Sequence, residues 1–177
     1  MNHTWIISDF SKNMHLQQLL DNRIRTLENE LALARCGATT EKTNTIIREV
    51  CIDIWNIFVA KKVGYHAPSK PDHAYMSEAF FMLWEQSGRQ SKLMTKIGVL
   101  EHETPMVVLR DRMLSTTDAH DLCNLLLRDL RLVWVTKQED VKLSRAGLAL
   151  SLPADGSSRY TAVGIQILPD LVQYKNL

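Results

Sequence analysis

Two long segments with apolar residues at every third or fourth position constrain the fold of this chain more than any other feature. In residues 16–34 the apolar side chains fall on one helical face, and in residues 46–58 they form a second, wider stripe. Gly37 lies between the two segments, and glycine is a common residue just past a helix end. The second stripe is the more hydrophobic, so Ile54 is expected in the core. The sequence therefore predicts two long helices packed on each other.

Shorter elements are expected after this pair. Residues 64–72 are typical of a loop because they contain two prolines and a glycine. The next helix is predicted from about residue 73 to residue 86, and its apolar positions are Ala79, Phe80, Leu83 and Trp84. Further helices are predicted at residues 105–114, 119–130 and 136–146, and strands at residues 132–135, 148–152 and 160–168.

These elements indicate a mainly α (α+β) fold. About six helices would form a compact, bundle-like body, with a small β-sheet near the C-terminus. The 177 residues are expected to make a single domain. Residues 1–130 would form its helical body, and residues 131–177 its β-containing part.

The charge balance argues against a dedicated nucleic-acid-binding protein. The chain has 21 basic and 20 acidic residues, a formal net charge of +1. Nonspecific nucleic-acid binding depends mainly on neutralising phosphates, so it usually requires a strong basic excess. Residues 89–96 carry three basic residues and no acid, in what is otherwise expected to be a solvated connection. A nucleic-acid-binding module remains an alternative if five side chains converge on one face: Arg89, Lys92, Lys96, Arg110 and Arg112.

The three cysteines indicate a reducing compartment. Cys36, Cys51 and Cys123 are far apart and include no CxxC pair, which argues against a zinc ribbon or a thioredoxin-like site. No apolar run reaches the roughly 18 residues that span a bilayer. The N-terminal segment is too short and too weakly charged for a secretory signal. We therefore expect a cytoplasmic protein that does not enter the membrane.

Residues 100–114 contain the sharpest candidate for chemistry. Glu101 and His102 precede Pro105, a residue favoured at the first position of a helix. This Glu-His-x-x-Pro pattern resembles the first half of the His-Asn-His (HNH) nuclease motif. The resemblance implies a histidine that activates water beside one divalent metal, Mg²⁺ or Mn²⁺, with later His or Asn residues completing the site. His120 and Asn124, four residues apart on a predicted helix, would supply that second half.

No phosphate-binding loop, dinucleotide glycine pattern or serine nucleophile motif accompanies this candidate. The leading hypothesis is therefore a non-enzymatic one: a small accessory or regulatory protein that acts through a protein partner or by self-association. No cofactor is predicted for it. The alternative is a metal-dependent phosphodiesterase using Glu101, His102, His120 and Asn124, which would need Mg²⁺ or Mn²⁺.

Overall fold

The computed structural model describes residues 14–60 and 74–169, which divide into two compact units. The first unit contains residues 14–60 and 109–130, and the second contains residues 74–108 and 131–169. One boundary between the units falls inside helix α6 (Met106–Leu114), so this helix contributes residues to both. The loop expected at residues 64–72 lies outside the described residues.

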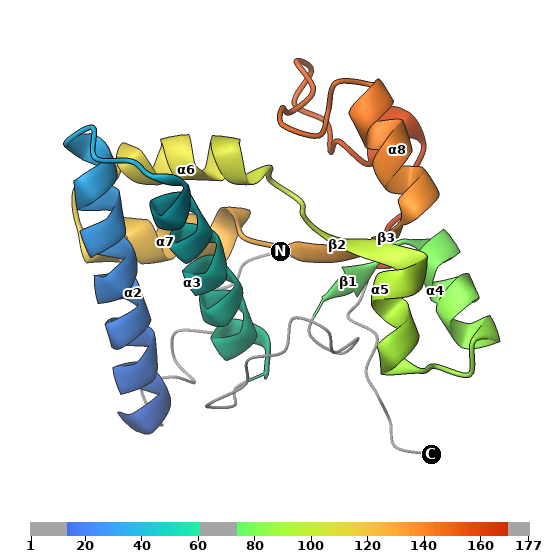
Figure 1. The fold of residues 1–177 in the computed structure, drawn as a ribbon, viewed down its shortest axis with the longest axis horizontal. Coiled ribbons are helices and arrows are strands. Elements are labelled where there is room, and N and C mark those ends of the chain that lie inside the picture. Colours follow the sequence, from blue (N-terminus) through green and yellow to red (C-terminus); the bar gives the residue numbers. More distant parts are fainter. Residues whose placement is uncertain (1–13, 61–73, 170–177) are drawn as a thin grey trace. The chain divides into compact units, whose positions relative to one another are not determined.

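The first unit is built on the two long helices that the apolar stripes predict. Helices α2 (Met14–Arg35) and α3 (Glu41–Ala60) pack side by side and are joined by a short turn (Figure 1). Gly37 takes the left-handed conformation in that turn, with φ of 75°. The stripes are buried as expected, and these side chains form the core: Leu20, Ile24, Leu27, Leu31, Ile47, Val50, Cys51, Ile54, Ile57 and Phe58.

Helices α6 and α7 (Ala119–Asp129) complete the first unit. Asp118 caps α7 by accepting a hydrogen bond from the backbone N–H of Asp121 at 2.8 Å. The Arg35 guanidinium, at the end of α2, donates to the carbonyls of Met113, Leu114 and Thr116 at the end of α6. A cation in this position complements the helix dipole at the C-terminal end of α6.

The second unit is built on a three-stranded mixed sheet. Strand β3 (Leu132–Thr136) lies in the middle, parallel to β1 (Tyr75–Met76) and antiparallel to β2 (Gly98–His102). All five residues of β3 are buried, as expected of a central strand. In the register, Glu101 lies opposite Val133 and His102 lies opposite Leu132.

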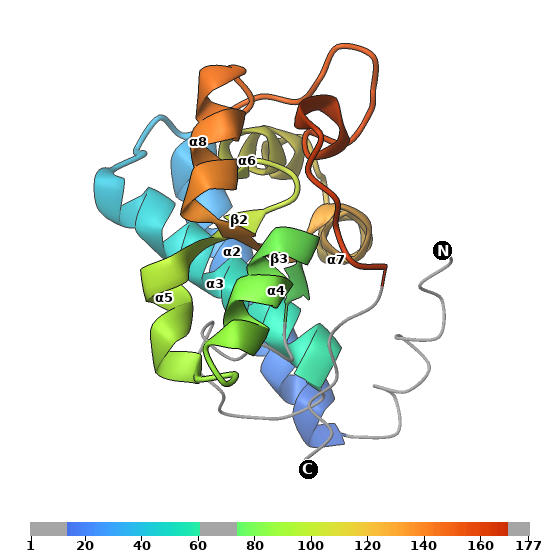
Figure 2. The same ribbon diagram turned by 90° about the vertical axis from the view of Figure 1, so that its right-hand side faces the viewer.

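Helices cover both faces of this sheet (Figures 1 and 2). Helix α8 (Lys137–Arg145) and the segment after it cover one face, where Val133 and Val135 pack with Tyr160. Helices α4 (Glu78–Gln86) and α5 (Met94–Ile97) cover the other, where the Phe80 and Trp134 rings stack with centroids 5.4 Å apart. Two short 3-10 helices complete the unit: η2 (Ser91–Leu93) and η3 (Thr161–Val163).

Gly98 lets α4 approach the sheet closely. A Cβ atom at this position would lie 2.3 Å from the Val135 carbonyl oxygen and 2.4 Å from the Phe80 ring. Real Cβ atoms do not come this near to backbone, so only glycine fits here without movement of the strand or the helix.

A buried hydrogen-bond network joins the starts of α4 and α8. Ser77 caps α4 by accepting from the Phe80 N–H, and its hydroxyl donates to a Glu139 carboxylate oxygen at 2.6 Å. The same carboxylate oxygen accepts from the Thr136 N–H at 2.8 Å, and Thr136 Oγ1 accepts from the Glu139 N–H. Thr136 and Glu139 therefore form a capping box, and the Ser77 hydroxyl connects it to a second helix.

Two of the three strands of the sheet are formed by other residues than predicted. The strand predicted at residues 132–135 is confirmed as β3, but β1 and β2 lie earlier in the chain, within stretches expected to be helix and connection. The strands predicted at residues 148–152 and 160–168 were wrong: the first segment is irregular, and the second contains η3 and a single bridge from Ile167 to Ser77. The apolar residues of these two segments pack against Leu143 of α8 and against Val133 and Val135 of the sheet, and they do not form strands of their own.

The predicted mainly helical α+β class is confirmed, with seven α-helices and a three-stranded mixed sheet among the described residues. The strands lie from the middle to the later part of the chain and not only near its C-terminus. Within residues 14–60 and 74–169, no helix has the length and apolar character needed to cross a membrane.

Candidate functional site

The Glu-His pair of the candidate motif belongs to a strand. Glu101 and His102 are the last two residues of β2, and α6 begins at Met106, one residue later than predicted. Neighbouring strand residues face opposite sides of the sheet, so Glu101 and His102 point in opposite directions. His102 is only 6% exposed. This imidazole is therefore buried on the face that α4 and α5 cover.

Glu101 lies in a polar cluster on the α8 face of the sheet. It forms an ion pair with Arg159, whose side chain is completely buried and also donates to the carbonyls of Leu148 and Ala149. Neighbouring Tyr160 is buried as well, and its burial raises the pKa of the phenol above its usual value. Each charge of the Glu101–Arg159 pair has a partner, as burial requires.

A second ion pair extends this cluster along the sheet. The Arg131 guanidinium bonds to Glu103 at 3.1 Å, and its Cζ lies 3.6 Å from the centroid of the Tyr75 ring. The stacking is a cation–π contact. Both acidic residues of the Glu-His-Glu stretch are thus used in ion pairs within the second unit, which accounts for them structurally.

The other half of the predicted nuclease site lies in the first unit. His120 and Asn124 project from one face of α7, as their spacing predicts, with Asn124 Nδ2 3.2 Å from His120 Nδ1. Both side chains are exposed. The structure therefore brings His120 to Asn124 and leaves Glu101 and His102 in the other unit. A catalytic role for these four residues stays a prediction.

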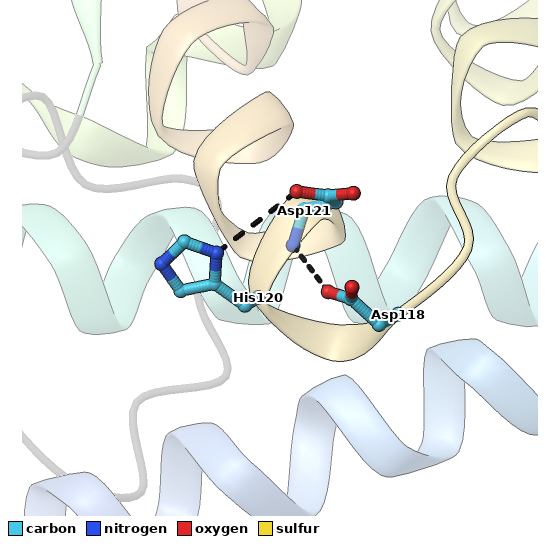
Figure 3. A group of neighbouring side chains, drawn as sticks. All are labelled: Asp118, His120 and Asp121. Atoms are coloured by element: carbon cyan, nitrogen blue, oxygen red, sulfur yellow. Dashed lines mark hydrogen bonds and ion pairs between the residues drawn. The ribbon is translucent and has the colours of Figure 1, made fainter.

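A group of side chains at the start of α7 could hold a metal ion (Figure 3). Asp118, His120 and Asp121 each offer a donor atom, and these atoms lie within 4.8 Å of one another. Carboxylate and imidazole are ordinary ligands for Mn²⁺ and Zn²⁺. All three residues are exposed, so water would have to complete the coordination. Asp118 already has a structural role, because its side chain caps α7.

The five predicted nucleic-acid-binding residues lie in both units. Arg89, Lys92 and Lys96 belong to the second unit, and Arg110 and Arg112 to the first. Three of them have acidic or amide partners: Arg89 pairs with Glu85, Arg110 with Asn44 and Asp111, and Arg112 with Asp129. Lys92 and Lys96 are exposed. A basic surface built from all five stays a prediction.

Helix α4 carries an exposed apolar surface that is not among the predicted site residues. Of the predicted apolar positions, Phe80 and Trp84 are buried but Leu83 is 43% exposed, and Met82 next to it is 55% exposed. Ala79 is exposed beside them. We call Ala79, Met82 and Leu83 the outer face of α4. Its signal in the sequence is that α4 is apolar around most of its circumference, which is typical of a helix covered on all sides.

The cysteines differ in exposure. All three are free: Cys51 is buried, Cys123 is half-buried and Cys36 is exposed. Burial raises the pKa of the Cys51 thiol to about 12, so this group stays protonated and unreactive near neutral pH.

Comparison with known proteins finds no matching family model, no matching curated protein and no matching solved structure.

Proposed function

We propose that this protein is a small accessory or regulatory protein that acts by associating with a protein, through the outer face of α4. One observation carries the proposal. Helix α4 is apolar around most of its circumference, yet Met82 and Leu83 remain largely exposed. Apolar helices of this kind are normally covered, and exposed apolar patches commonly mark interaction sites.

The surroundings of this face favour a fixed surface. Phe80 and Trp84, on the opposite side of α4, are completely buried, and Ser77 caps the helix by accepting a buried hydrogen bond from the Phe80 N–H. The face is therefore presented on a rigid element, which lowers the entropy that binding must offset. We place the protein in the cytoplasm, in keeping with its free cysteines.

The test is a comparison of the proteins that co-purify with the full chain from the cells in which it occurs. The double variant Met82→Glu/Leu83→Glu should lose the partner, because it puts two charges where a partner would bury apolar surface. Leu150→Glu is the matched control, since Leu150 is also apolar and is 72% exposed. Retention of the same proteins by the double variant would contradict a role for α4.

The second candidate is a metal-dependent phosphodiesterase, as the resemblance to the HNH motif implies. The contact between His120 and Asn124 supports it, because the second half of that motif requires these two side chains together. If it is correct, the full chain should cleave DNA or RNA with Mg²⁺ or Mn²⁺, and His102→Ala and His120→Ala should each abolish cleavage. Loss of activity without a change in melting temperature would separate catalysis from folding. Cleavage that survives both substitutions would exclude these histidines.

A further inference from the structure

Residues 149–165, which we call the strap, lie on the α8 face of the sheet without joining it. The strap leaves the end of α8, runs through an open loop and returns at η3 (Figure 2). Its outer part is exposed, because Leu150 and residues 154–156 face solvent. Its inner part is buried, because Tyr160 and Ile165 belong to the apolar cluster between the sheet and α8. The strap therefore consists of an exposed loop held down by two buried side chains.

The backbone of the strap is not bonded to the elements beneath it. Among the residues that the structure describes, it donates no hydrogen bond to the sheet or to α8 and accepts none from them. Apart from those of Arg159, the hydrogen bonds of the strap join residues at most five positions apart. The backbone is fixed again just beyond the strap, where the Gln166 carbonyl accepts from the Glu78 N–H at 2.9 Å. Isolated turns of this kind are unstable on their own, so the strap depends on its side chains.

The Arg159 side chain supplies the hydrogen bonds that fix the strap in place. Its Nη1 donates to the Leu148 carbonyl at 2.9 Å and to the Ala149 carbonyl at 3.2 Å, which closes the loop on itself. Its Nη2 donates to the Glu101 carboxylate on β2. The Arg159 side chain is completely buried, so loss of its acidic partner would leave a buried charge unpaired. One side chain therefore both closes the loop and fastens it to the sheet.

We infer that the strap is a conformational device that opens from the sheet as one unit while α8 and the three strands stay folded, and that Arg159 is its latch. Opening breaks the bonds of Arg159 and exposes Tyr160 and Ile165, but it breaks no backbone hydrogen bond of the sheet. Segments with few such bonds open at a lower free energy than the core around them. The open form presents the Tyr160 phenol and one face of the sheet to solvent. The strap covers the opposite face of the sheet from α4, so its opening is independent of the proposed binding surface.

Hydrogen exchange of the full chain, followed by mass spectrometry of its peptides, tests the opening without any substitution. The backbone N–H groups of residues 162–165 all donate to carbonyls inside the strap. They should exchange together, and about tenfold or more faster than the bonded amides of β3 and α8, because a local opening is more frequent than unfolding of the core. Exchange no faster than that of β3 would overturn the inference, since the strap would then open only when the whole unit unfolds.

Glu101→Gln tests the latch in the same experiment. It should speed exchange in the strap about a hundredfold and leave exchange in β3 and α8 nearly unchanged, because it leaves the buried Arg159 charge unpaired. Glu103→Gln is the matched control, since Glu103 is on the same segment but pairs with Arg131, which lies outside the strap. This half-buried pair contributes less, so exchange in the strap should change less than about fivefold. Equal acceleration of the strap and β3, or equal effects of the two variants, would contradict the latch.

Trypsin gives a second readout, because it cleaves after arginine and Arg159 is buried in the closed form. Cleavage between Arg159 and Tyr160 should therefore follow the population of the open form. In Glu101→Gln its rate should rise about a hundredfold, in parallel with exchange, while Glu103→Gln should stay close to the unsubstituted chain. Equal rates in all three chains would show that the ion pair does not hold the strap. If Glu101→Gln instead unfolds the full chain, the pair supports the whole unit and the strap is not a separate device.

Discussion

Replacing Glu139 with alanine is expected to lower the free energy of unfolding by about 4 kcal/mol, because it removes a helix cap and leaves two buried donors without an acceptor. The carboxylate oxygen accepts from the Ser77 hydroxyl and from the Thr136 N–H, and Ser77 and Thr136 are themselves buried. The alanine side chain cannot accept either bond, and little water can replace it. Urea denaturation followed by far-ultraviolet circular dichroism would measure the change.

Two comparisons make this prediction specific. Gln138→Ala, at an exposed position of α8, should change stability by less than about 0.5 kcal/mol. A double-mutant cycle with Ser77→Ala should give a coupling energy of about 1–3 kcal/mol, because the two residues share one hydrogen bond across 62 positions of sequence. Additive effects would show that the two caps act separately and that the buried bond between them contributes nothing.

Ile54→Ala is expected to cost about 2–5 kcal/mol, as large-to-small changes in a core do. Ile54 is completely buried in α3, and its neighbours Val50, Ile57 and Phe58 are buried too, so the cavity has little room to collapse. The same denaturation experiment would measure it. Leu33→Ala is the control, because Leu33 lies on α2 in the same unit and is 48% exposed. A loss below about 0.5 kcal/mol for Ile54→Ala would show that this stripe is not part of the core.

Ile54 and Glu139 differ in how far the sequence alone predicts their roles. The place of Ile54 follows from a pattern in its own helix, in which apolar residues recur with the helical period. The capping box of Glu139 also follows from local spacing, since Thr136 is three residues away. The bond to Ser77 does not, because no rule of spacing connects residues that lie on separate helices.

The candidate site shows the same division. The four-residue spacing of His120 and Asn124 predicted that their side chains would meet on one helix face, and they do. The sequence predicts a helix that begins at Pro105, shortly after Glu101 and His102, and the start of that helix is correct to within one residue. The sequence did not indicate that these two residues finish a strand, because β2 has no alternating pattern and forms only by pairing with β3.

Local sequence by itself determined helices α2, α3, α7 and α8 and the central strand β3, because helix periodicity, caps and a compact apolar run depend on residues within a few positions of one another. The tertiary structure alone decided the strands β1 and β2, the burial of Arg159 against Glu101, and the exposure of Met82 and Leu83 on a helix apolar enough to be buried. Each of these depends on what lies opposite in space. Arg159 and Glu101 are 58 residues apart, and the side of α4 that faces the sheet is chosen by Trp134, which stacks on Phe80 from a strand about 50 residues later in the chain.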